Sequence, residues 1–570
     1  MRLGLSCMLV VILATIFSFT TSLAVADDQS IRQTMLKLAD KDKKVRQAAI
    51  EKLATTKDER LVEFLESYRT SSLYLWNGKL VLCEQMITDE DYNKSAPLSD
   101  PLAREPLMAD GTQIVVPSEN LQEIRARRAD RKTASEGILH LQLSLADVDK
   151  RLAAVKKLGD QRKVNYLARL QEIMDNDESE QVRYGAHESI LLIRLDDFIP
   201  GETKSDRLAA ARVLGEMRSA RALSSLKRLL KHLEKEAQGG KPVDARARKV
   251  YESAAEQIES YQSKVRSIGY LFQGLSRGSV LILMALGLAI TFGVMGVINM
   301  AHGELMMIGA MATYTMQELF DGMIESGLLP ESAFNWYYVA ALPVAIVSAG
   351  VTGYLMELFV VRHLYGRPLE TLLATWGIGL VLIVSVRLIY GFNVGVNAPT
   401  WARGGVEVAQ DLIIPYSRIF IIVLAAVVVL VIYILLNFTK LGLLVRATMQ
   451  NRDMAAGLGV NTRLIDGYTF ALGAALAGIA GWGVTLIAGV SPNMGSTYIV
   501  DSFLVVVTGG VGKIVGTVWA GLGLGVLDKF LEPIFGAVWG KVVILTCIAM
   551  FIQWRPQGLF PPKGRLADVV

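Results

Sequence analysis

Residues 271–297 have the sequence LFQGLSRGSVLILMALGLAITFGVMGV, which is almost entirely apolar and long enough to cross a bilayer as a helix. Further apolar segments follow at 303–320, 336–360, 369–390, 416–437, 464–489, 514–530 and 536–554, with a shorter one at 498–508. No soluble fold accounts for so many uncharged stretches, because in lipid every backbone polar group must be satisfied within its own helix. Residues 266–570 are therefore predicted to form an all-α polytopic membrane helix bundle of about eight full spans plus one short or broken helix.

The charges divide the 570-residue chain into two different halves. Residues 1–270 hold 43 Lys and Arg and 40 Asp and Glu, whereas residues 271–570 hold only 16 and 15. The net charge is +4 and both signs are balanced in each half, which excludes a basic surface for nucleic acid. The cysteines, Cys7, Cys83 and Cys547, are isolated, and the five histidines are far apart, so neither a disulfide nor a metal site is expected.

Residues 1–26 have the pattern of a secretory signal peptide. Arg2 supplies the positive start, Met8 to Phe19 the apolar core, and Ala24-Val25-Ala26 a cleavage site. The apolar core is short for a membrane span, although an uncleaved anchor helix is the alternative. In both cases the segment that follows lies outside the cytoplasm.

Residues 27–265 are predicted to form an extracytoplasmic helical domain with HEAT-like repeats. A similar helix start recurs at Val45-Arg46-Gln47-Ala48-Ala49, Lys150-Arg151-Leu152-Ala153-Ala154, Val182-Arg183-Tyr184-Gly185-Ala186 and Asp206-Arg207-Leu208-Ala209-Ala210. A non-helical insertion at 73–117 contains the β-like run Thr112 to Val116. This domain is expected either to offer a docking surface or only to pack against its membrane partner.

The basic residues of the second half give an orientation. The connection after the second span carries Asp321 and Glu325 but no Lys or Arg, whereas that after the fifth carries Lys440 and Arg446 among others. With the first half outside, this distribution follows the positive-inside rule. The basic tail from Arg555 onward is then cytoplasmic, which requires an odd number of crossings.

Polar residues interrupt the first apolar hairpin at Asn299-Met300-Ala301-His302-Gly303-Glu304. Ionisable groups at membrane depth usually face a wet cavity or a partner, so His302 and Glu304 are candidate substrate contacts. The alternative is an interfacial turn capped by Asn299, with Glu304 early in the next helix. The spacing does not match His-Glu-x-x-His, which argues against a zinc protease.

The long connection at 438–463 is predicted to contain a short amphipathic helix ended by Gly457 or Gly459. A motor subunit could grip such a helix from the cytoplasm. The alternative is a helix that rests on lipid, which would not explain the small residues Ala455 and Ala456.

The run Gly509-Gly510-Val511-Gly512-Lys513 is similar to a phosphate-binding loop but does not match the motif of such loops. The motif requires an earlier glycine and a hydroxyl after the lysine, and residue 514 is Ile. No cofactor or nucleotide site is therefore expected in this chain, and any ATP must bind to a partner.

Several of these segments together resemble the permease subunits of bacterial ATP-binding-cassette (ABC) importers of the branched-chain amino acid type. The segments are GVMGVINMAHGE at 293–304, AAGLGV at 455–460, GGVG at 509–512 and RPQGLF at 555–560. The signal peptide, the exported helical extension and LETLLATWG at 369–377 resemble the urea-transporting branch of that family more narrowly.

The resemblance implies that residues 445–460 form a coupling helix seated on an ATPase in the cytoplasm. The residues expected in this role are Arg446, Arg452, Asp453, Ala455, Ala456, Gly457 and Gly459. It also implies that a second permease, two ATPases and a periplasmic binding protein complete an importer in the bacterial inner membrane.

Urea is small, neutral and rich in hydrogen-bonding groups, so a path lined by Asn299, Thr375 and Thr508 would suit it. The alternative substrates are branched-chain amino acids or short amides. A passive channel would use the same helices without a motor. An intramembrane enzyme is not expected, because no pair of catalytic residues has suitable spacing.

Overall fold

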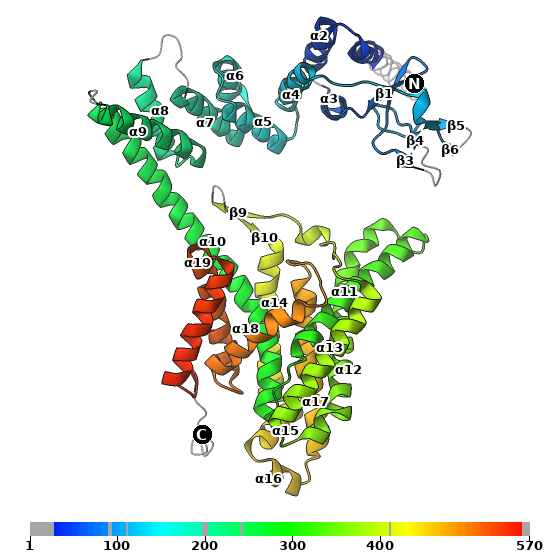
Figure 1. Ribbon diagram of the computed structural model, residues 1–570, viewed down its shortest axis with the longest axis vertical. Coiled ribbons are helices and arrows are strands. Elements are labelled where there is room, and N and C mark those ends of the chain that lie inside the picture. Colours follow the sequence, from blue (N-terminus) through cyan, green and yellow to red (C-terminus); the bar gives the residue numbers. More distant parts are fainter. Residues whose placement is uncertain are drawn as a thin grey trace, which may run out of the picture. The chain divides into compact units, whose positions relative to one another are not determined.

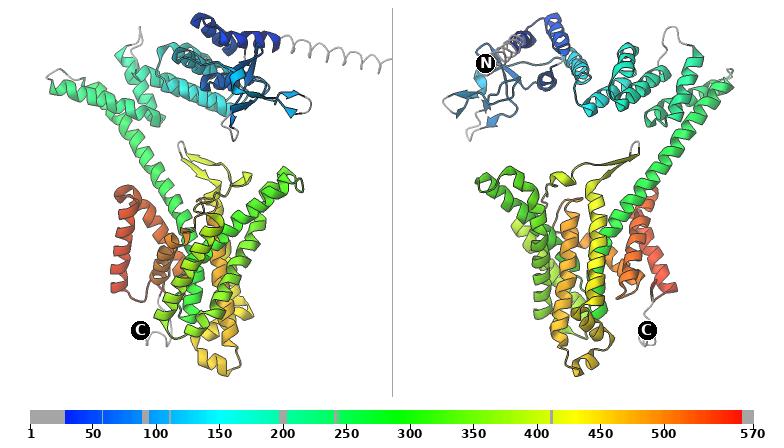
Figure 2. Two further views of the ribbon diagram at one scale, coloured as in Figure 1. Left: turned by 45° about the vertical axis from the view of Figure 1, so that its right-hand side comes forward. Right: turned by 180° about the vertical axis from the view of Figure 1, so that it is seen from behind.

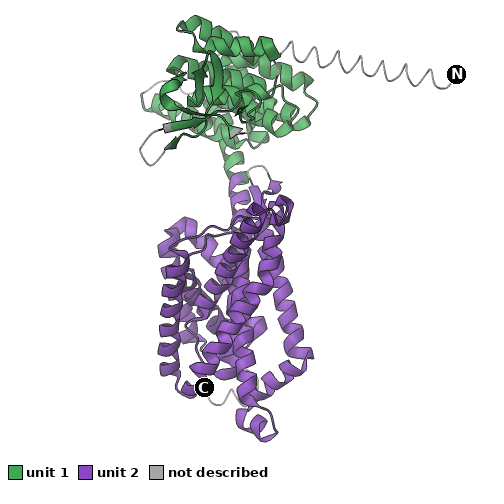
Figure 3. Ribbon diagram, turned by 90° about the vertical axis from the view of Figure 1, so that its right-hand side faces the viewer, with its two compact units in different colours: residues 1–261 green, residues 262–570 purple. Residues whose placement is uncertain are grey.

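The computed structural model describes residues 28–56, 58–88, 94–109, 112–196, 203–239, 242, 244–409 and 412–560. The chain forms two compact units, unit 1 (residues 1–261) and unit 2 (residues 262–570), coloured separately in Figure 3. The predicted signal peptide, residues 1–26, lies outside the described residues, as do Lys563 and Arg565 of the basic tail.

Unit 1 is built mainly from short helices that pack on their neighbours in sequence (Figure 1). They are η1 Lys37–Ala39, α2 Lys43–Ala54, α3 Arg60–Thr70, α4 Arg128–Gln142, α5 Val148–Asp160, η3 Val164–Tyr166, α6 Leu167–Asn176, α7 Glu180–Asp196, α8 Lys204–Glu216, η4 Ala220–Ala222, α9 Leu223–Gln238 and the start of α10, Ala245–Met295. One apolar cluster lies between α5, α6 and α7, and the next lies between α7, α8, α9 and α10. The described part of unit 1 is thus mainly helical, as predicted.

The arginine of the repeated helix start has a structural role. Arg46, Arg151 and Arg183 each donate from Nη1 to two backbone carbonyls, five and six residues earlier, over 2.6 to 3.1 Å. Two of them also pair with a carboxylate, Arg46 with Asp130 and Arg151 with Asp177. Each arginine therefore fixes the loop before its helix, which explains why the motif recurs at helix starts.

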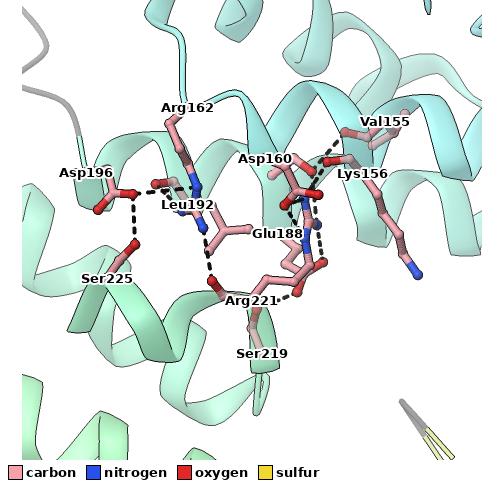
Figure 4. A network of polar contacts seen from close by, with 11 residues as sticks. Val155, Lys156, Asp160, Arg162, Glu188, Leu192, Asp196, Ser219, Arg221 and Ser225 are labelled. Carbon is pink, nitrogen blue, oxygen red and sulfur yellow. Dashed lines mark hydrogen bonds and ion pairs between the residues drawn. The ribbon is translucent and has the colours of Figure 1, made fainter. Parts of the chain in front are cut away.

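A second set of buried polar contacts joins α5, α7 and η4 (Figure 4). Arg221 donates to Glu188 over 2.7 Å and to Asp160 over 2.9 Å, and Ser219 donates to the other oxygen of Glu188 over 2.5 Å. Arg162 donates to the carbonyls of Leu192 and Arg221, both over 2.9 Å. Because the Glu188 side chain is only 3% exposed, its negative charge is stabilised by these partners and not by water.

The insertion between α3 and α4 forms small antiparallel sheets. The strands are β1 Leu73–Trp76, β2 Lys79–Leu82, β3 Ile87–Thr88, β4 Lys94–Pro97, β5 Met108–Ala109, β6 Thr112–Gln113, β7 Val115–Pro117 and β8 Gln122–Glu123, and the two three-stranded sheets have the orders β2-β1-β8 and β3-β4-β7. Asn77 and Gly78 connect β1 to β2 with φ of 49° and 73°, a conformation that matches the twist of a hairpin. The predicted β-like run therefore belongs to a larger β-insertion.

Unit 2 is a helix bundle (Figures 1 and 2). Its elements are the second part of α10, α11 His302–Glu325, η5 Glu331–Trp336, α12 Tyr337–Phe359, η6 Val361–Leu364, α13 Pro368–Tyr390, η7 Thr400–Ala402, α14 Tyr416–Phe438, α15 Lys440–Gln450, α16 Arg452–Gly457, α17 Thr462–Val484, α18 Met494–Gly509 and α19 Ile514–Trp554. Six helices in the described chain are long and apolar enough to cross a membrane. The φ of 79° at Gly536 divides α19 into two helical segments, which correspond to two of the predicted spans.

Helices α11, α12 and α17 pack against one another, and their contacts require small residues. A Cβ at Gly478 would lie 2.6 Å from the carbonyl oxygen of Ala345. Helices α10 and α19 meet in the same way, because a Cβ at Gly278 would lie 2.7 Å from the carbonyl oxygen of Gly521, and one at Gly274 would lie 2.6 Å from Cα of Val526. The small residues of these spans therefore serve close packing.

The structure differs from the predicted spans in detail. Helix α17 ends at Val484, five residues before the predicted end, and the short helix α18 starts at Met494 rather than at 498. The connection before α14 contains a β-hairpin, β9 Gly405–Ala409 and β10 Leu412–Pro415, which the sequence analysis did not foresee. This hairpin lies at one end of the bundle, and α15 and α16 lie at the other (Figure 1).

Candidate functional site

The polar segment at 299–304 forms the turn between α10 and α11. Helix α10 ends at Met295, Gly296 has a φ of 67°, and α11 begins at His302. Asn299, His302 and Glu304 are all buried, with His302 fully enclosed. The segment is therefore a tightly packed break inside the bundle.

The side chains of Asn299 and Thr375 both accept hydrogen bonds from backbone amides of this turn. The Asn299 side-chain oxygen accepts a hydrogen bond from the Ala301 amide over 3.1 Å. The Thr375 hydroxyl accepts from the Met300 amide over 3.1 Å and donates to the Leu372 carbonyl over 3.0 Å. Nδ2 of Asn299 has no hydrogen-bond partner among the residues that the structure describes, so a donor remains free at this point of the bundle.

His302 and Glu304 face different helices, although only one residue separates them. Nε2 of His302 lies 3.0 Å from the Met284 carbonyl of α10. The Glu304 carboxyl lies against Gly379 of α13, where a Cβ would approach Glu304 Cδ to 3.2 Å. Within the described part of the chain, Nδ1 of His302 and Oε2 of Glu304 have no hydrogen-bond partner, so each can accept or donate a hydrogen bond according to its protonation.

Thr508 does not belong to this group. Gly495, near the start of α18, packs against Gly303, and Thr508 lies thirteen residues further along the same helix. At 1.5 Å per residue this places Thr508 about 20 Å from the turn. Its carbonyl accepts a hydrogen bond from the Leu559 amide over 2.8 Å. The structure thus brings four of the five predicted path residues into one region and separates the fifth.

The connection at 438–463 is not one helix over 445–460. It contains α15 and α16, which are separated at Asn451, a residue with extended backbone whose side chain accepts from the Met454 amide over 2.9 Å. This capping bond starts a new helix and explains the break. Arg446 lies on α15, whereas Arg452, Asp453, Ala455, Ala456 and Gly457 form α16, and Gly459 follows with a φ of 86°.

Helix α16 exposes apolar side chains and is anchored by a charged one. Met454 and Leu458 are 62% and 79% exposed, whereas Ala455 is buried against the bundle. The Arg452 guanidinium donates to both oxygens of Asp466 in α17 and lies 4.2 Å from the ring centroid of Tyr365. The start of the helix is therefore fixed by Arg452, and Met454 and Leu458 form an exposed apolar tip toward its other end.

A cluster of four charges between α10, α18 and α19 was missed by the sequence analysis. Arg277 lies 3.1 Å from Asp501 and 2.8 Å from Asp528, and Lys541 lies 3.9 Å from Asp501. These side chains line a cavity of about 320 Å³ together with Ser496 and others. Charged residues inside apolar spans could have identified it, because such residues are expensive in lipid unless they are paired.

Comparison with known proteins identifies relatives of both units. Residues 270–552 match the family "Branched-chain amino acid transport system / permease component", and residues 206–232, which cover most of α8 and of α9, match the PBS lyase HEAT-like repeat.

The relatives of the chain are transport proteins rather than enzymes. The high-affinity branched-chain amino acid transport system permease protein BraD of Pseudomonas aeruginosa is 30% identical over 295 residues, which cover 51% of this chain and 94% of BraD. The corresponding protein LivH of Escherichia coli is 29% identical over 298 residues, 51% of this chain and 94% of LivH. A probable LivH of Methanocaldococcus jannaschii is 26% identical over 293 residues, 49% and 88% of the two chains.

Proposed function

The chain belongs to the family of branched-chain amino acid transport system permease components, and from this premise we propose that it carries urea inward across the bacterial inner membrane. It is a membrane permease subunit of an ABC importer and not an enzyme. Transport then proceeds by alternating access, in which separate ATPase subunits shift the balance between outward-facing and inward-facing states.

The proposal of urea rests on the unpaired polar atoms of the turn between α10 and α11. Among the described residues, neither the donor Asn299 Nδ2 nor Glu304 Oε2 in the same short segment has a hydrogen-bond partner. Urea carries one carbonyl acceptor and four N–H donors, so it can satisfy both kinds of group without a net charge of its own. Buried polar atoms without partners are expensive, which favours a solute that supplies the missing hydrogen bonds.

The second candidate substrate is a branched-chain amino acid or a short amide. The names of the relatives support it, since BraD and LivH are branched-chain amino acid permeases. An amino acid would place an ammonium group near Glu304, which has no ion pair within the described residues. Direct uptake competition decides between the two substrates.

The proposed ATPase contact is the exposed tip of α16. Met454 and Leu458 offer apolar side chains to a partner, and the Arg452–Asp466 pair fixes the direction of the helix. In the proposed assembly, two ATPases bind the cytoplasmic end of this permease and a second permease, and a periplasmic binding protein delivers the solute. ATP is bound by the partner subunits alone.

The proposed orientation places residues 27–265 in the periplasm and the C-terminus in the cytoplasm. It rests on the predicted leader and on the basic residues at the α15–α16 end of unit 2. Unit 1 would then lie on the side from which solute arrives, where its helical surface can receive a partner. Reporter fusions near residue 450 are expected to be cytoplasmic, and a periplasmic result would contradict the importer.

The test is uptake into vesicles that contain the purified importer with its partners. Labelled urea should accumulate only with ATP and the binding protein, and excess unlabelled leucine should not compete. If labelled leucine accumulates and urea does not reduce its accumulation, the substrate is the amino acid and not urea. Urea flux that continues after ATP depletion would instead support a passive channel.

A further inference from the structure

A second cavity in unit 2, of about 580 Å³, lies beside α15 and has a different lining. It is enclosed by the last turns of α10 and α14, by α15, and by the turn from Gly512 into the start of α19. Most of its wall is apolar, and includes Val445 and Met449. Its polar lining consists chiefly of Arg446, Lys513 and Asn437.

The charges of this lining all have one sign. Arg446 comes from α15 and Lys513 from the turn before α19, and among the described residues no Asp or Glu lines the cavity. Neither cation forms an ion pair within the described part of the chain, and Arg446 donates only to the neutral side-chain oxygen of Asn437, over 3.0 Å. Two uncompensated cations beside one cavity create a site for an anion.

The cavity lies at the ends of three helices of membrane-spanning length. Its walls come from the ends of α10 and α14 and from the start of α19, three helices long and apolar enough to cross a bilayer. Lys and Arg at such ends reach toward lipid headgroups while their carbon chains stay in apolar surroundings. The apolar wall and the two cations therefore match the two parts of a lipid.

We propose that this cavity binds the headgroup of an anionic phospholipid, with its phosphate between Arg446 and Lys513 and part of an acyl chain against Val445 and Met449. Basic pockets between membrane helices on the cytoplasmic side recognise such headgroups elsewhere. The proposal also gives a role to Lys513, whose glycine-rich surroundings do not form a nucleotide loop. It requires only that unit 2 spans a membrane, and it is independent of the substrate.

The site is distinct from the proposed ATPase contact. Met454 and Leu458 project from α16, whereas Arg446 lines the cavity from the preceding helix. A bound lipid would support α15 from the bundle side and thereby hold the segment that carries α16. A neutral solute on its way through the bundle would not need two cations at this point.

The experiment uses the full chain, delipidated in detergent and then mixed with equal amounts of palmitoyl-oleoyl phosphatidylglycerol and phosphatidylcholine. Native mass spectrometry counts the lipids retained. Wild type should retain phosphatidylglycerol about tenfold more than phosphatidylcholine, and Arg446→Gln/Lys513→Gln should lose this preference, since each basic residue contributes to attraction of an anionic headgroup. The charge-conserving variant Arg446→Lys/Lys513→Arg should keep it.

Arg367→Gln is the matched control, because Arg367 is an exposed arginine between α12 and α13 that does not line the cavity. It should retain phosphatidylglycerol like wild type. Equal retention of the two lipids by wild type would overturn the proposal without any variant, even if the double glutamine variant does not fold. Inorganic phosphate that displaces phosphatidylglycerol at millimolar concentration would show a free-anion site and overturn the lipid assignment.

Discussion

Arg452, the first residue of α16, donates through both terminal nitrogens to the carboxylate of Asp466 in α17, a side chain that is only 2% exposed. The pair crosses the connection between the two helices and holds the short helix to the longer one. The Asp466 carboxylate is buried and the Arg452 side chain is one-third exposed. The pair therefore fixes the start of α16 while one side of the arginine stays in contact with solvent.

Asp466→Asn is expected to lower the free energy of unfolding by about 1–3 kcal/mol, because the arginine loses its anion and a charge-assisted hydrogen bond. A double-mutant cycle with Arg452→Gln, followed by thermal unfolding, measures the coupling. The exposed pair Arg367–Glu370 is the control, with a coupling of at most about 1 kcal/mol. Equal coupling in the two pairs would contradict the anchoring role.

Leu458→Asp is expected to abolish ATP-driven uptake while the chain still folds. Its side chain is 79% exposed, so a carboxylate there disturbs no core but opposes burial in a partner. Loss of a central apolar contact weakens association about tenfold or more, which co-purification of the ATPase subunits measures. Leu328→Asp, at an equally exposed leucine between α11 and η5, should leave co-purification unchanged.

Thr375→Val is expected to reduce urea uptake, because the Met300 amide loses its acceptor and the turn that holds Asn299 loosens. Loss of one such hydrogen bond costs about 1 kcal/mol, so a fall of about fivefold in uptake at low urea is expected. Thr546→Val, an exposed threonine of α19, is the isosteric control. Asn299→Ala and Thr375→Val variants with normal uptake and normal expression would remove the proposed path.

Arg277→Gln is expected to destabilise the full chain by about 3–5 kcal/mol, since it leaves Asp501 and Asp528 without their shared cation. Adding Asp501→Asn, Asp528→Asn and Lys541→Gln removes the other three charges of the cluster, including Lys541 at 3.9 Å from Asp501, and should restore much of the loss. Thermal unfolding in detergent follows all variants. A variant with all four charges removed that is less stable than Arg277→Gln alone would show that the charges do not act as one cluster.

In unit 1, Arg221→Ala is expected to destabilise the packing of α5 on α7 by about 3 kcal/mol, because Glu188 is left buried without its cation. Hydrogen exchange of the full chain should speed up in these two helices. Arg228→Ala removes an exposed arginine and should have little effect. Unchanged protection of α7 in Arg221→Ala would contradict this view of the network.

Much of the helical architecture could be predicted because its determinants are local. The apolar runs identified the spanning segments of unit 2, and the repeated pattern of Arg-x followed by Ala-Ala or Gly-Ala identified helix starts in unit 1. Even the division of 514–554 into two spans has a local determinant, since Gly536 alone adopts a positive φ inside α19.

The arrangement of the site could not be predicted, because it depends on contacts between distant segments. Sequence spacing does not show that His302 faces α10 while Glu304 faces α13, or that Thr508 lies a helix length away from the turn. The charge cluster joins Arg277 to Asp501 and Asp528, more than two hundred residues away. Each member is a single charge in an apolar run, a pattern that matches no sequence motif.

The backbone contact of α10 with the first segment of α19 limits how the bundle can rearrange. At Gly274 and Gly278 the backbones of the two helices are in direct contact. No layer of side chains lies between them there that could change rotamers and let one helix slide past the other. The two helices must consequently travel as one rigid body during any transport cycle. Gly536, with its φ of 79°, lies beyond this contact, and the part of the chain that follows it is joined to α18 instead, by Lys541 at 3.9 Å from Asp501 and by the hydrogen bond from the Leu559 amide to the Thr508 carbonyl.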